Sequence, residues 1–568
     1  MQQTPQPRPY NLFGALRPQH RSDGIAPDWA LRFGQVDQQR HTFAQGQMAQ
    51  PVVLTDLRKS KRSHAEQSHD EATLNDGARG TLRGRGNPTI ACKRWSLDAL
   101  RWIERRIAMK KLGEHAIVIG AGMGGLLAAR VLSDFYTVVT VLERDAFPAA
   151  DTPRKGVPQG RHTHGLLARG SAILEEFFPG YNMEVVAQSG GLIGDVANDV
   201  IWIGRNVRLA NGTSDLTGLL ASRPVLEGHL RRRLLGLPNV RAIERCAVRG
   251  LATDPVRRSV TGVRMCVEGQ PETTINADLV VDATGRGSSS AAWLEELGYQ
   301  PPANEKVEIG ISYMTRTYRR RSTDLDGKQG IVVAGSAPNW RNGVMLAQEG
   351  DSWIVSAGGF LGDDAPDNDD GFLAYLATLP TMEIHDVVAS AEQLGEFRRY
   401  RYAASQRRRY EKLARFPENY LVFGDAICSF NPVYGQGMTV AAEEALTLQQ
   451  CLRTGSKDLA RRFFRAAAKI VDIPWDIAVG NDLRHPHVKG ARPPMLRFIN
   501  WYIGKLHLAA TRDSTLATVF LKVVNLMMPP STLLSPAIAR RVWQGNRKPV
   551  PSAPSPAIEV ARRNSASS

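Results

Sequence analysis

The chain has 568 residues, of which 42% are hydrophobic, and a formal net charge of +16. This length supports two or three domains with a sizeable core. There is no apolar run of the roughly 18 residues that a transmembrane helix requires, no secretory leader pattern and no CxxC spacing among the five cysteines. The sequence therefore argues against a membrane span, a zinc site and a disulfide framework, and we expect a cytoplasmic protein.

The positive charge is not confined to one tail, since residues 1–108 contain 17 basic and 10 acidic side chains and the remainder is also basic. A generally basic surface is the main interpretation, and contact with an anionic membrane is the main alternative. Because no nucleic-acid-binding module is recognisable, we predict no nucleic-acid partner and at most peripheral membrane contact.

Residues 1–108 are rich in Gln, Arg, Pro, Gly and His, a composition typical of a disordered, low-complexity extension. Within it, residues 95–107 are compatible with a short basic amphipathic helix. An equally good alternative is that the natural chain begins at Met109, directly before the first predicted strand.

The first ordered pattern is a strand at 115–119, a glycine loop at 120–125, a helix at 126–132 and a second strand at 138–142. In the loop, Gly120 permits a tight turn, Gly122 lets the backbone approach a pyrophosphate, and Gly125 lets the helix pack closely on the sheet. Glu143, at the end of the second strand and followed by Arg144, is placed to accept hydrogen bonds from a ribose diol. This context predicts a dinucleotide-binding fold, although it does not choose between NAD and FAD.

Two more buried strands, 277–282 and 420–423, each end in a glycine turn, at Gly285 and at Gly424-Asp425. Asp425 is suited to hold a ribityl hydroxyl group. The loop after it leads into a helix whose N-terminus would stabilise negative charge on a reduced flavin. This loop supplies four candidates: Pro432, Gly435, Gly437 and Met438.

Longer strands are predicted at 307–318, 331–334, 344–347 and 353–357, and mostly helices beyond residue 440. The helical periodicity of residues 516–527 is typical of core packing. The segment 496–501 is compatible with a position on a bilayer, but core packing is the commoner arrangement.

In this order, the three glycine motifs resemble those of the flavoprotein monooxygenases with the p-hydroxybenzoate hydroxylase fold. Residues 156–167 and 431–438 are further similar to a bacterial subgroup that includes the olefin epoxidases of polyether biosynthesis. Arg223 is similar to the arginine that lies beside FAD in the family, and Arg154 is a further cofactor-binding candidate. The chain departs from the family in lacking the Asp-Gly pair of its second fingerprint, which leaves NAD(P)H docking open.

The resemblance implies an α/β protein with a discontinuous Rossmann-type FAD-binding domain, an inserted mixed or antiparallel substrate-binding sheet and a helical C-terminal region. We expect the FAD-binding parts, the substrate-domain parts and the terminal regions to be divided along the chain as follows: FAD-binding at 109–185, 218–300 and 401–455; substrate domain at 186–217 and 301–400; helical region at 456–545; disordered tail at 546–568.

The function implied is that of an FAD-dependent monooxygenase, which inserts oxygen from O2 into an apolar small molecule through a flavin peroxide, by epoxidation or hydroxylation. Electrons would come from NAD(P)H or from a flavin- or ferredoxin-type partner reductase. Two rivals share the fold: a flavin halogenase, for which Lys155 is the available lysine, and an FAD-dependent prenyl or olefin reductase. No catalytic side chain can be named, and no metal ligand set is recognisable.

Two basic stretches have open interpretations. The loop with Arg154, Lys155, Arg161, His162 and His164 either covers the flavin or is a solvated basic loop. The runs 398–402 and 407–410 combine arginine with tyrosine and are most simply interpreted as a solvated face, with contact to nucleic acid, to an acidic substrate or to a partner reductase as alternatives.

Overall fold

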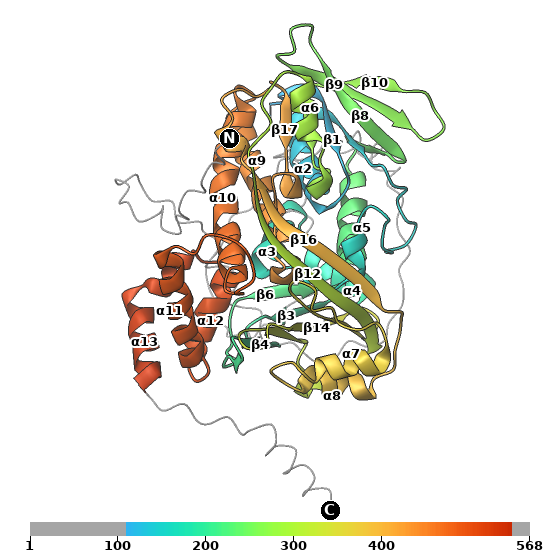
Figure 1. Ribbon diagram of the computed structural model, residues 1–568. Coiled ribbons are helices and arrows are strands. Elements are labelled where there is room, and N and C mark those ends of the chain that lie inside the picture. Colours follow the sequence, from blue (N-terminus) through green and yellow to red (C-terminus); the bar gives the residue numbers. More distant parts are fainter. Residues whose placement is uncertain (1–109, 548–568) are drawn as a thin grey trace, which may run out of the picture. The chain divides into compact units, whose positions relative to one another are not determined.

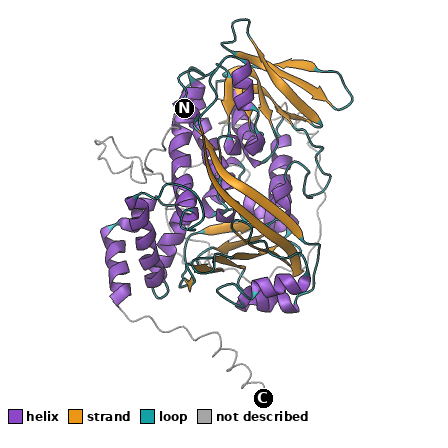
Figure 2. Ribbon diagram, viewed as in Figure 1, coloured by secondary structure: helices purple, strands orange, loops and turns teal. Residues whose placement is uncertain are grey.

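The structure is a computed structural model that describes residues 110–547, all within one compact unit. The disorder expected for residues 1–108 and for the C-terminal tail concerns residues outside this range, except that 546 and 547 belong to a helix. Two large sheets with helices packed on them, two small antiparallel sheets and a helical C-terminal region make up the described chain (Figures 1 and 2).

A five-stranded parallel sheet contains the first glycine motif. Its strand order is β17 (Tyr420–Val422), β11 (Leu279–Asp282), β1 (Gly113–Ile119), β2 (Tyr136–Leu142) and β7 (Val240–Ile243). Residues 116–119 of β1 are almost fully buried, as expected for a parallel strand that is covered on both faces. The strands come from three separate stretches of the chain, which confirms the discontinuous nucleotide-binding fold.

Helices cover this sheet. The predicted helix 126–132 is confirmed and is longer than expected, forming α2 (Met123–Phe135), which contacts α5 (Arg223–Leu235) and α9 (Gly437–Arg453). Three shorter helices complete this part: α3 (Ala168–Phe177), α4 (Tyr181–Ser189) and α6 (Ser290–Glu296). The chain between β7 and β11 forms a three-stranded antiparallel sheet that we did not predict from the sequence. Its strands are β8 (Cys246–Thr253), β9 (Val260–Val267) and β10 (Thr273–Asn276).

The second large sheet has eight strands and is antiparallel except for the pair β13–β4. Its order is β18 (Cys428–Ser429), β16 (Arg398–Arg408), β12 (Asn304–Arg319), β15 (Ser352–Gly359), β14 (Asn342–Gln348), β13 (Gly330–Ala334), β4 (Val200–Gly204) and β5 (Val207–Arg208). The four strands predicted between 307 and 357 are confirmed. Helices α7 (Asp369–Leu376) and α8 (Glu383–Ser390) pack on this sheet through a core that contains Trp353 and Phe372. A separate pair, β3 (Leu192–Asp195) and β6 (Thr217–Leu220), forms a small antiparallel sheet.

The C-terminal region consists of α10 (Leu459–Asp482), α11 (Pro494–Ala510), α12 (Ser514–Val524) and α13 (Pro536–Arg547). Leu516 is buried in its core, in agreement with the predicted packing face. The expectation of core packing for 496–501 is wrong in part, because Leu496 is buried whereas Phe498 and Trp501 are 48% and 58% exposed. Within residues 110–547, no helix is both long and apolar enough to cross a bilayer.

Candidate functional site

The glycine motifs meet at one cavity of about 1060 Å³. Strands β1, β11 and β17 are parallel, so their carboxyl ends reach the same edge of the sheet, where α/β proteins bind nucleotides. Thirteen of the fourteen residues predicted to hold a cofactor line this cavity. They are Gly120, Gly122, Glu143, Arg144, Arg154, Arg223, Gly285, Gly424, Asp425, Pro432, Gly435, Gly437 and Met438.

The fourteenth, Gly125, has a packing role behind the cavity wall. A Cβ atom at Gly125 would lie 1.8 Å from the carbonyl oxygen of Gly120, so only glycine lets α2 approach the loop. By contrast, a Cβ atom at Gly122 would meet no atom within 4 Å, because it would enter the cavity. Gly122 is also the N-cap of α2, whose first turn has no acidic residue and no side-chain cap. This helix end is therefore a free anion site with space for a pyrophosphate.

A buried ion-pair network lies beside the glycine loop. Glu143 accepts hydrogen bonds from the backbone N–H groups of Ala121 and Asp145, at 2.8 and 3.0 Å, and its Oε2 lies 3.0 Å from Arg154 Nη1. Arg154 also donates to Glu227, which pairs in turn with Arg223. Burial opposes the charge on Arg154, but Glu227 and Glu143 outweigh it and raise its pKa. The network fixes Glu143, Arg154 and Arg223 at the wall of the cavity.

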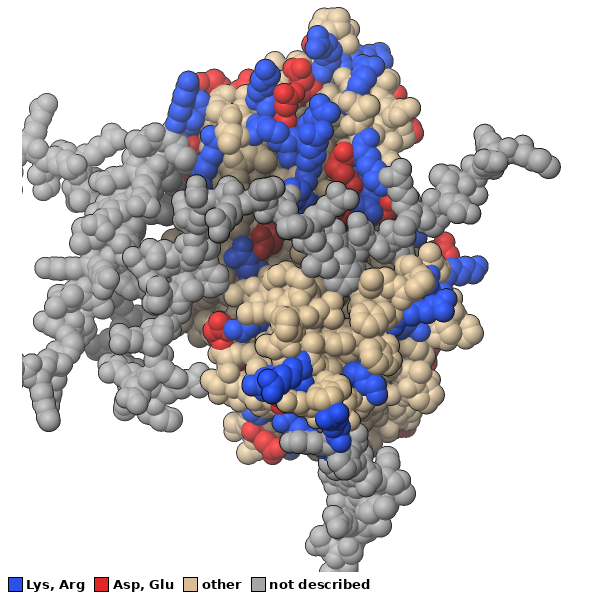
Figure 3. Space-filling view, turned by 90° about the vertical axis from the view of Figure 1, so that its left-hand side faces the viewer, with Lys and Arg blue, Asp and Glu red and all other residues tan. Residues whose placement is uncertain are grey.

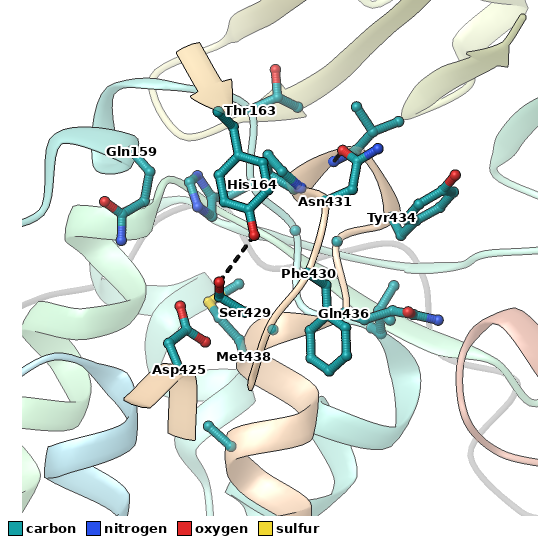
Figure 4. Close-up of a pocket in the computed structure, with 18 of the residues that line it drawn as sticks. Gln159, Thr163, His164, Asp425, Ser429, Phe430, Asn431, Tyr434, Gln436 and Met438 are labelled. Carbon is teal, nitrogen blue, oxygen red and sulfur yellow. Dashed lines mark hydrogen bonds between the residues drawn. The ribbon is translucent and has the colours of Figure 1, made fainter. Parts of the chain in front are cut away.

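The second and third motifs form the opposite wall. Gly424 has a φ of +67° at the start of a short 3-10 turn, and its N–H donates to the buried Glu444 at 2.7 Å. The Asp425 side chain faces the cavity, which accounts for its exposed surface (Figure 4). The surrounding protein desolvates the carboxylate and thereby raises the pKa of Asp425. On the same side, the hydroxyl groups of Tyr402 and Ser429 are hydrogen-bonded at 3.0 Å.

The carboxylate of Asp482 anchors the loop that precedes α9. Asn431 Nδ2 and the Tyr434 hydroxyl both donate to Oδ1 of Asp482, at 2.8 and 2.7 Å. Burial raises the pKa of Asp482 to about 7, although these two donors oppose the shift. The loop then turns through Gly435, with a φ of +65°, into the N-terminus of α9, which has no acidic residue in its first turn. The N-terminus of α9 therefore lies at the cavity wall without an acidic side chain of its own.

No family model matches the chain. Protein Rv3254 of Mycobacterium tuberculosis (strain ATCC 25618 / H37Rv) is 35% identical to it over 482 residues, and the match covers 78% of this chain and 98% of that protein. The chain belongs to the family of Protein Rv3254.

Solved structures show the fold of this family. The flavin-dependent brominase Bmp2 superposes with a TM-score of 0.54 at 14% identity, covering 77% of this chain and 99% of Bmp2. A flavoprotein/dehydrogenase from Cytophaga hutchinsonii gives 0.54 at 16% identity, covering 76% of this chain and 100% of its own. A PqsL variant from P. aeruginosa gives 0.50 at 16% identity, covering 66% and 97%. The family thus has the fold of flavin-dependent oxidoreductases.

The basic loop of residues 154–164 is solvated in one part and lines the cavity in another, so neither of its two interpretations describes all of it. Lys155 and Arg161 are exposed and do not line the cavity, so they behave as a solvated loop. His162 is buried, bonds Thr315 Oγ1 at 2.8 Å and lies beside the rings of Tyr313 and Tyr400. His164 does line the cavity and donates from Nδ1 to the His162 carbonyl at 2.9 Å. Burial lowers the pKa of His162 to about 4 and that of His164 to about 3, so both rings are neutral near pH 7.

The arginine–tyrosine run is a strand with two different faces. In β16, Arg399 and Arg401 point outward and pair with Asp364, as a solvated face would. Tyr400 and Tyr402 alternate with them and line the cavity. Sequence reasoning missed these two tyrosines, although the period of two was visible between residues 398 and 402. It also missed Glu227 and Asp482, which pair with Arg154 and with Asn431 and Tyr434, residues that lie far away in the sequence.

Proposed function

We propose that the chain binds FAD in this cavity and inserts one oxygen atom of O2 into an apolar organic molecule, by epoxidation or hydroxylation. The observation that carries the proposal is a single cavity whose two ends are lined by different kinds of residue. The nucleotide end is built from the glycine loops, Glu143 and two helix N-termini. The other end is lined by apolar side chains of the mixed sheet and the C-terminal helices, such as Ile203, Ile503 and Phe520.

The described residues suit FAD. The open space at Gly122 and the free end of α2 would receive the pyrophosphate, with Glu143 near the ribose and Asp425 near the ribityl chain. The N-terminus of α9 would face the pyrimidine end of the ring system and stabilise negative charge there. When bound, FAD supplies the activation of oxygen, and the protein supplies orientation and a dry cavity.

Within the monooxygenase class we propose an alkene substrate, on the similarity of residues 156–167 and 431–438 to the olefin epoxidases. We also propose NAD(P)H or a partner reductase as electron donor, and a cytoplasmic location. The halogenase alternative loses its candidate, because Lys155 lies outside the cavity and no lysine of the described chain lines it.

Rapid mixing of the chemically reduced protein with oxygenated buffer tests the proposal. We expect a transient absorbing species before the spectrum of oxidised flavin returns, and the same species whether or not halide is present. Direct, slow reoxidation without a transient would contradict the proposal and favour the olefin reductase. Consumption of the transient only when halide is added would favour the halogenase.

A further inference from the structure

Two arginine side chains lie in the apolar part of the cavity without a carboxylate partner. Arg205 stands at the turn between β4 and β5, and Arg484 follows the end of α10. Their hydrogen-bond acceptors are neutral: Arg205 donates to the carbonyl and side-chain oxygens of Asn500, and Arg484 donates to Asn481 Oδ1 and Ser336 Oγ. Within residues 110–547 neither forms an ion pair, whereas Arg154 and Arg223 at the nucleotide end share Glu227.

The backbone conformation and the electrostatic surroundings of Arg205 are both unfavourable. Arg205 and the next residue, Asn206, have φ values of +54° and +64°, and this left-handed region is costly for residues other than glycine, asparagine and aspartate. Burial and then the positive charge of Arg484 lower the pKa of Arg205 to about 9, so the two cations repel each other. Besides Glu143 and Asp425 at the nucleotide end, the carboxylate of Asp476 lines the cavity, but its charged neighbours include Asp472, Arg407 and Arg409. Local rules of this kind are most often broken at functional sites.

We propose that Arg205 and Arg484 form an anion-binding subsite that holds a carboxylate or phosphate group of the substrate. Each guanidinium group has five N–H donors, and the bonds to Asn500, or to Asn481 and Ser336, leave others to bind the oxygens of an acid. Apolar side chains line the space around them, including Trp202, Leu209 and Leu533. The substrate is therefore an apolar molecule with one acidic end. This inference rests on the proposed function, because it assumes that the apolar end of the cavity is the substrate site.

Calorimetric titration of the full-length, flavin-loaded protein tests the subsite. The probes are dodecanoate, dodecyl phosphate and dodecan-1-ol, which share one chain and differ in the end group. We expect at least one of the two acids to bind about ten times more tightly than the alcohol, because charge-assisted hydrogen bonds are stronger than neutral ones. Arg205→Gln and Arg484→Gln should each remove most of this preference and leave alcohol binding unchanged.

Arg208→Gln is the matched control, because Arg208 lies on the same hairpin but is exposed and pairs with Glu383. Three results would each overturn the subsite. They are equal binding of the acids and the alcohol, an absence of acid binding by flavin-loaded protein, and full acid preference in the double variant Arg205→Gln/Arg484→Gln. The flavin content and the oxygen reaction without ligand are recorded on the same samples. If these are normal while the acid preference is missing, the subsite is wrong and the proposed function stands.

A second inference comes from an independent observation on the outer face of α11 and α13. Met495, Phe498 and Trp501 recur every three residues along α11 and are 46%, 48% and 58% exposed, and Trp543 on α13 is 56% exposed. These helices lie at the left of Figure 1, so their outer face is turned toward the viewer in Figure 3, where it is largely uncharged with scattered basic groups. Exposed aromatic patches of this kind mark interaction sites.

The charges around this face are mostly positive. Five Lys and Arg residues lie on α11 and α13, and the one carboxylate of residues 483–547, Asp513, pairs with Arg541. Arg497, Lys505 and Arg540 are exposed and pair with no carboxylate of the described chain. The opposite side of α11 lines the cavity through Leu496, Ile499 and Ile503.

We infer that this face docks on an anionic lipid bilayer, with the aromatic and methionine side chains at the level of the headgroups and the basic side chains against lipid phosphates. In that position a single helix would separate the bilayer, a store of apolar molecules, from the cavity. The interaction is peripheral, since no helix of residues 110–547 can span the membrane.

Co-sedimentation of the full-length protein with vesicles tests the surface. We expect binding to phosphatidylcholine vesicles that contain phosphatidylglycerol, weaker binding to phosphatidylcholine alone, and loss with rising salt. The double variant F498S/W501S should bind weakly, whereas the control Met183→Ser, which removes a 59% exposed methionine from α4, should bind as the parent does. Equal loss in the control, or no binding by the parent, would overturn the inference. So would a dimer that the double variant dissociates, because the face would then serve a second copy.

Discussion

Gly122 and Gly125 lie three residues apart in one loop, yet added side chains should have different effects at the two positions: loss of FAD at Gly122 and loss of fold stability at Gly125. Gly122 has a φ of −73°, so Gly122→Val is compatible with the backbone and would project into the cavity. We expect this variant to fold and to lose FAD, because the side chain would occupy the place of the pyrophosphate. Gly125→Ala should instead destabilise the fold by roughly 1–3 kcal/mol or more through overpacking against Gly120.

Flavin absorbance per protein and the melting temperature of the flavin-free protein separate the two effects. An unchanged flavin content in Gly122→Val would refute the cofactor site. A Gly125→Ala protein as stable as the parent would show that α2 can shift away from the loop.

Glu444 should make stability depend on pH in the opposite sense to most carboxylates. Its side chain is fully buried on α9, and burial raises its pKa to about 8 from 4.5. The folded protein therefore keeps a proton that the unfolded chain has lost at neutral pH. Stability from this group is fully present below about pH 4.5 and is lost as the pH rises through 8.

Glu444→Gln keeps an acceptor for the Gly424 N–H and never ionises, so it should melt at a higher temperature than the parent at pH 8–9. The expected gain is roughly 1 kcal/mol or more and should shrink toward pH 5. Melting curves of the flavin-free proteins across this range provide the check. A difference that is the same at every pH would show that the parent carboxylate does not titrate in this window.

At the scale of elements, one buried asparagine joins the C-terminal helices to the nucleotide-binding part. Asn525 caps α12, accepts from the Ala168 N–H at the start of α3 at 3.1 Å, and donates to the Leu521 carbonyl at 3.0 Å. Asn525→Leu would leave the Ala168 N–H buried without a partner, so we expect a loss of about 1–3 kcal/mol. Urea denaturation measures this loss. The control Asn546→Ala, near the surface of α13, should cost about 0.5 kcal/mol or less, and equal losses would argue against a special role for this contact.

The elements that the sequence predicted well are those whose signals are local. The strand, glycine loop, helix and second strand around Gly120–Gly125 lie within one short stretch, and each later motif is a strand that runs directly into its glycine turn. The strand β16 was missed because its arginines suggested a solvated run, although Tyr400 and Tyr402 alternate with them. Asp482 was missed because Asn431 and Tyr434 are about fifty residues away. The face of α11 was misjudged because helical periodicity identifies an apolar stripe but not what covers it.

At the scale of the whole molecule, the distribution of charge is more uneven than a division at residue 108 suggests. The described chain up to residue 482 is close to neutral, whereas residues 483–547 hold ten basic side chains and one acidic one. Five of these ten, Arg497, Lys505, Arg540, Arg541 and Arg547, lie on α11 and α13, the helices that expose Phe498, Trp501 and Trp543. A concentrated excess next to apolar side chains is the pattern expected of an interfacial surface rather than of a generally basic protein.

The extension at the N-terminus leads to the last prediction, that residues 109–568 perform the function of the whole chain. Within residues 110–547, every residue that lines the cavity lies between Ile119 and Leu534, and the match that covers 98% of Protein Rv3254 takes in only 78% of this chain. We therefore expect the 109–568 fragment to match the full chain in FAD content, melting temperature and oxygen reaction, measured by absorbance, calorimetry and rapid mixing. A fragment that folds but has lost its flavin, or reoxidises without the transient that the full chain shows, would place a functional contribution within residues 1–108. Such a result would also contradict the alternative that the natural chain begins at Met109.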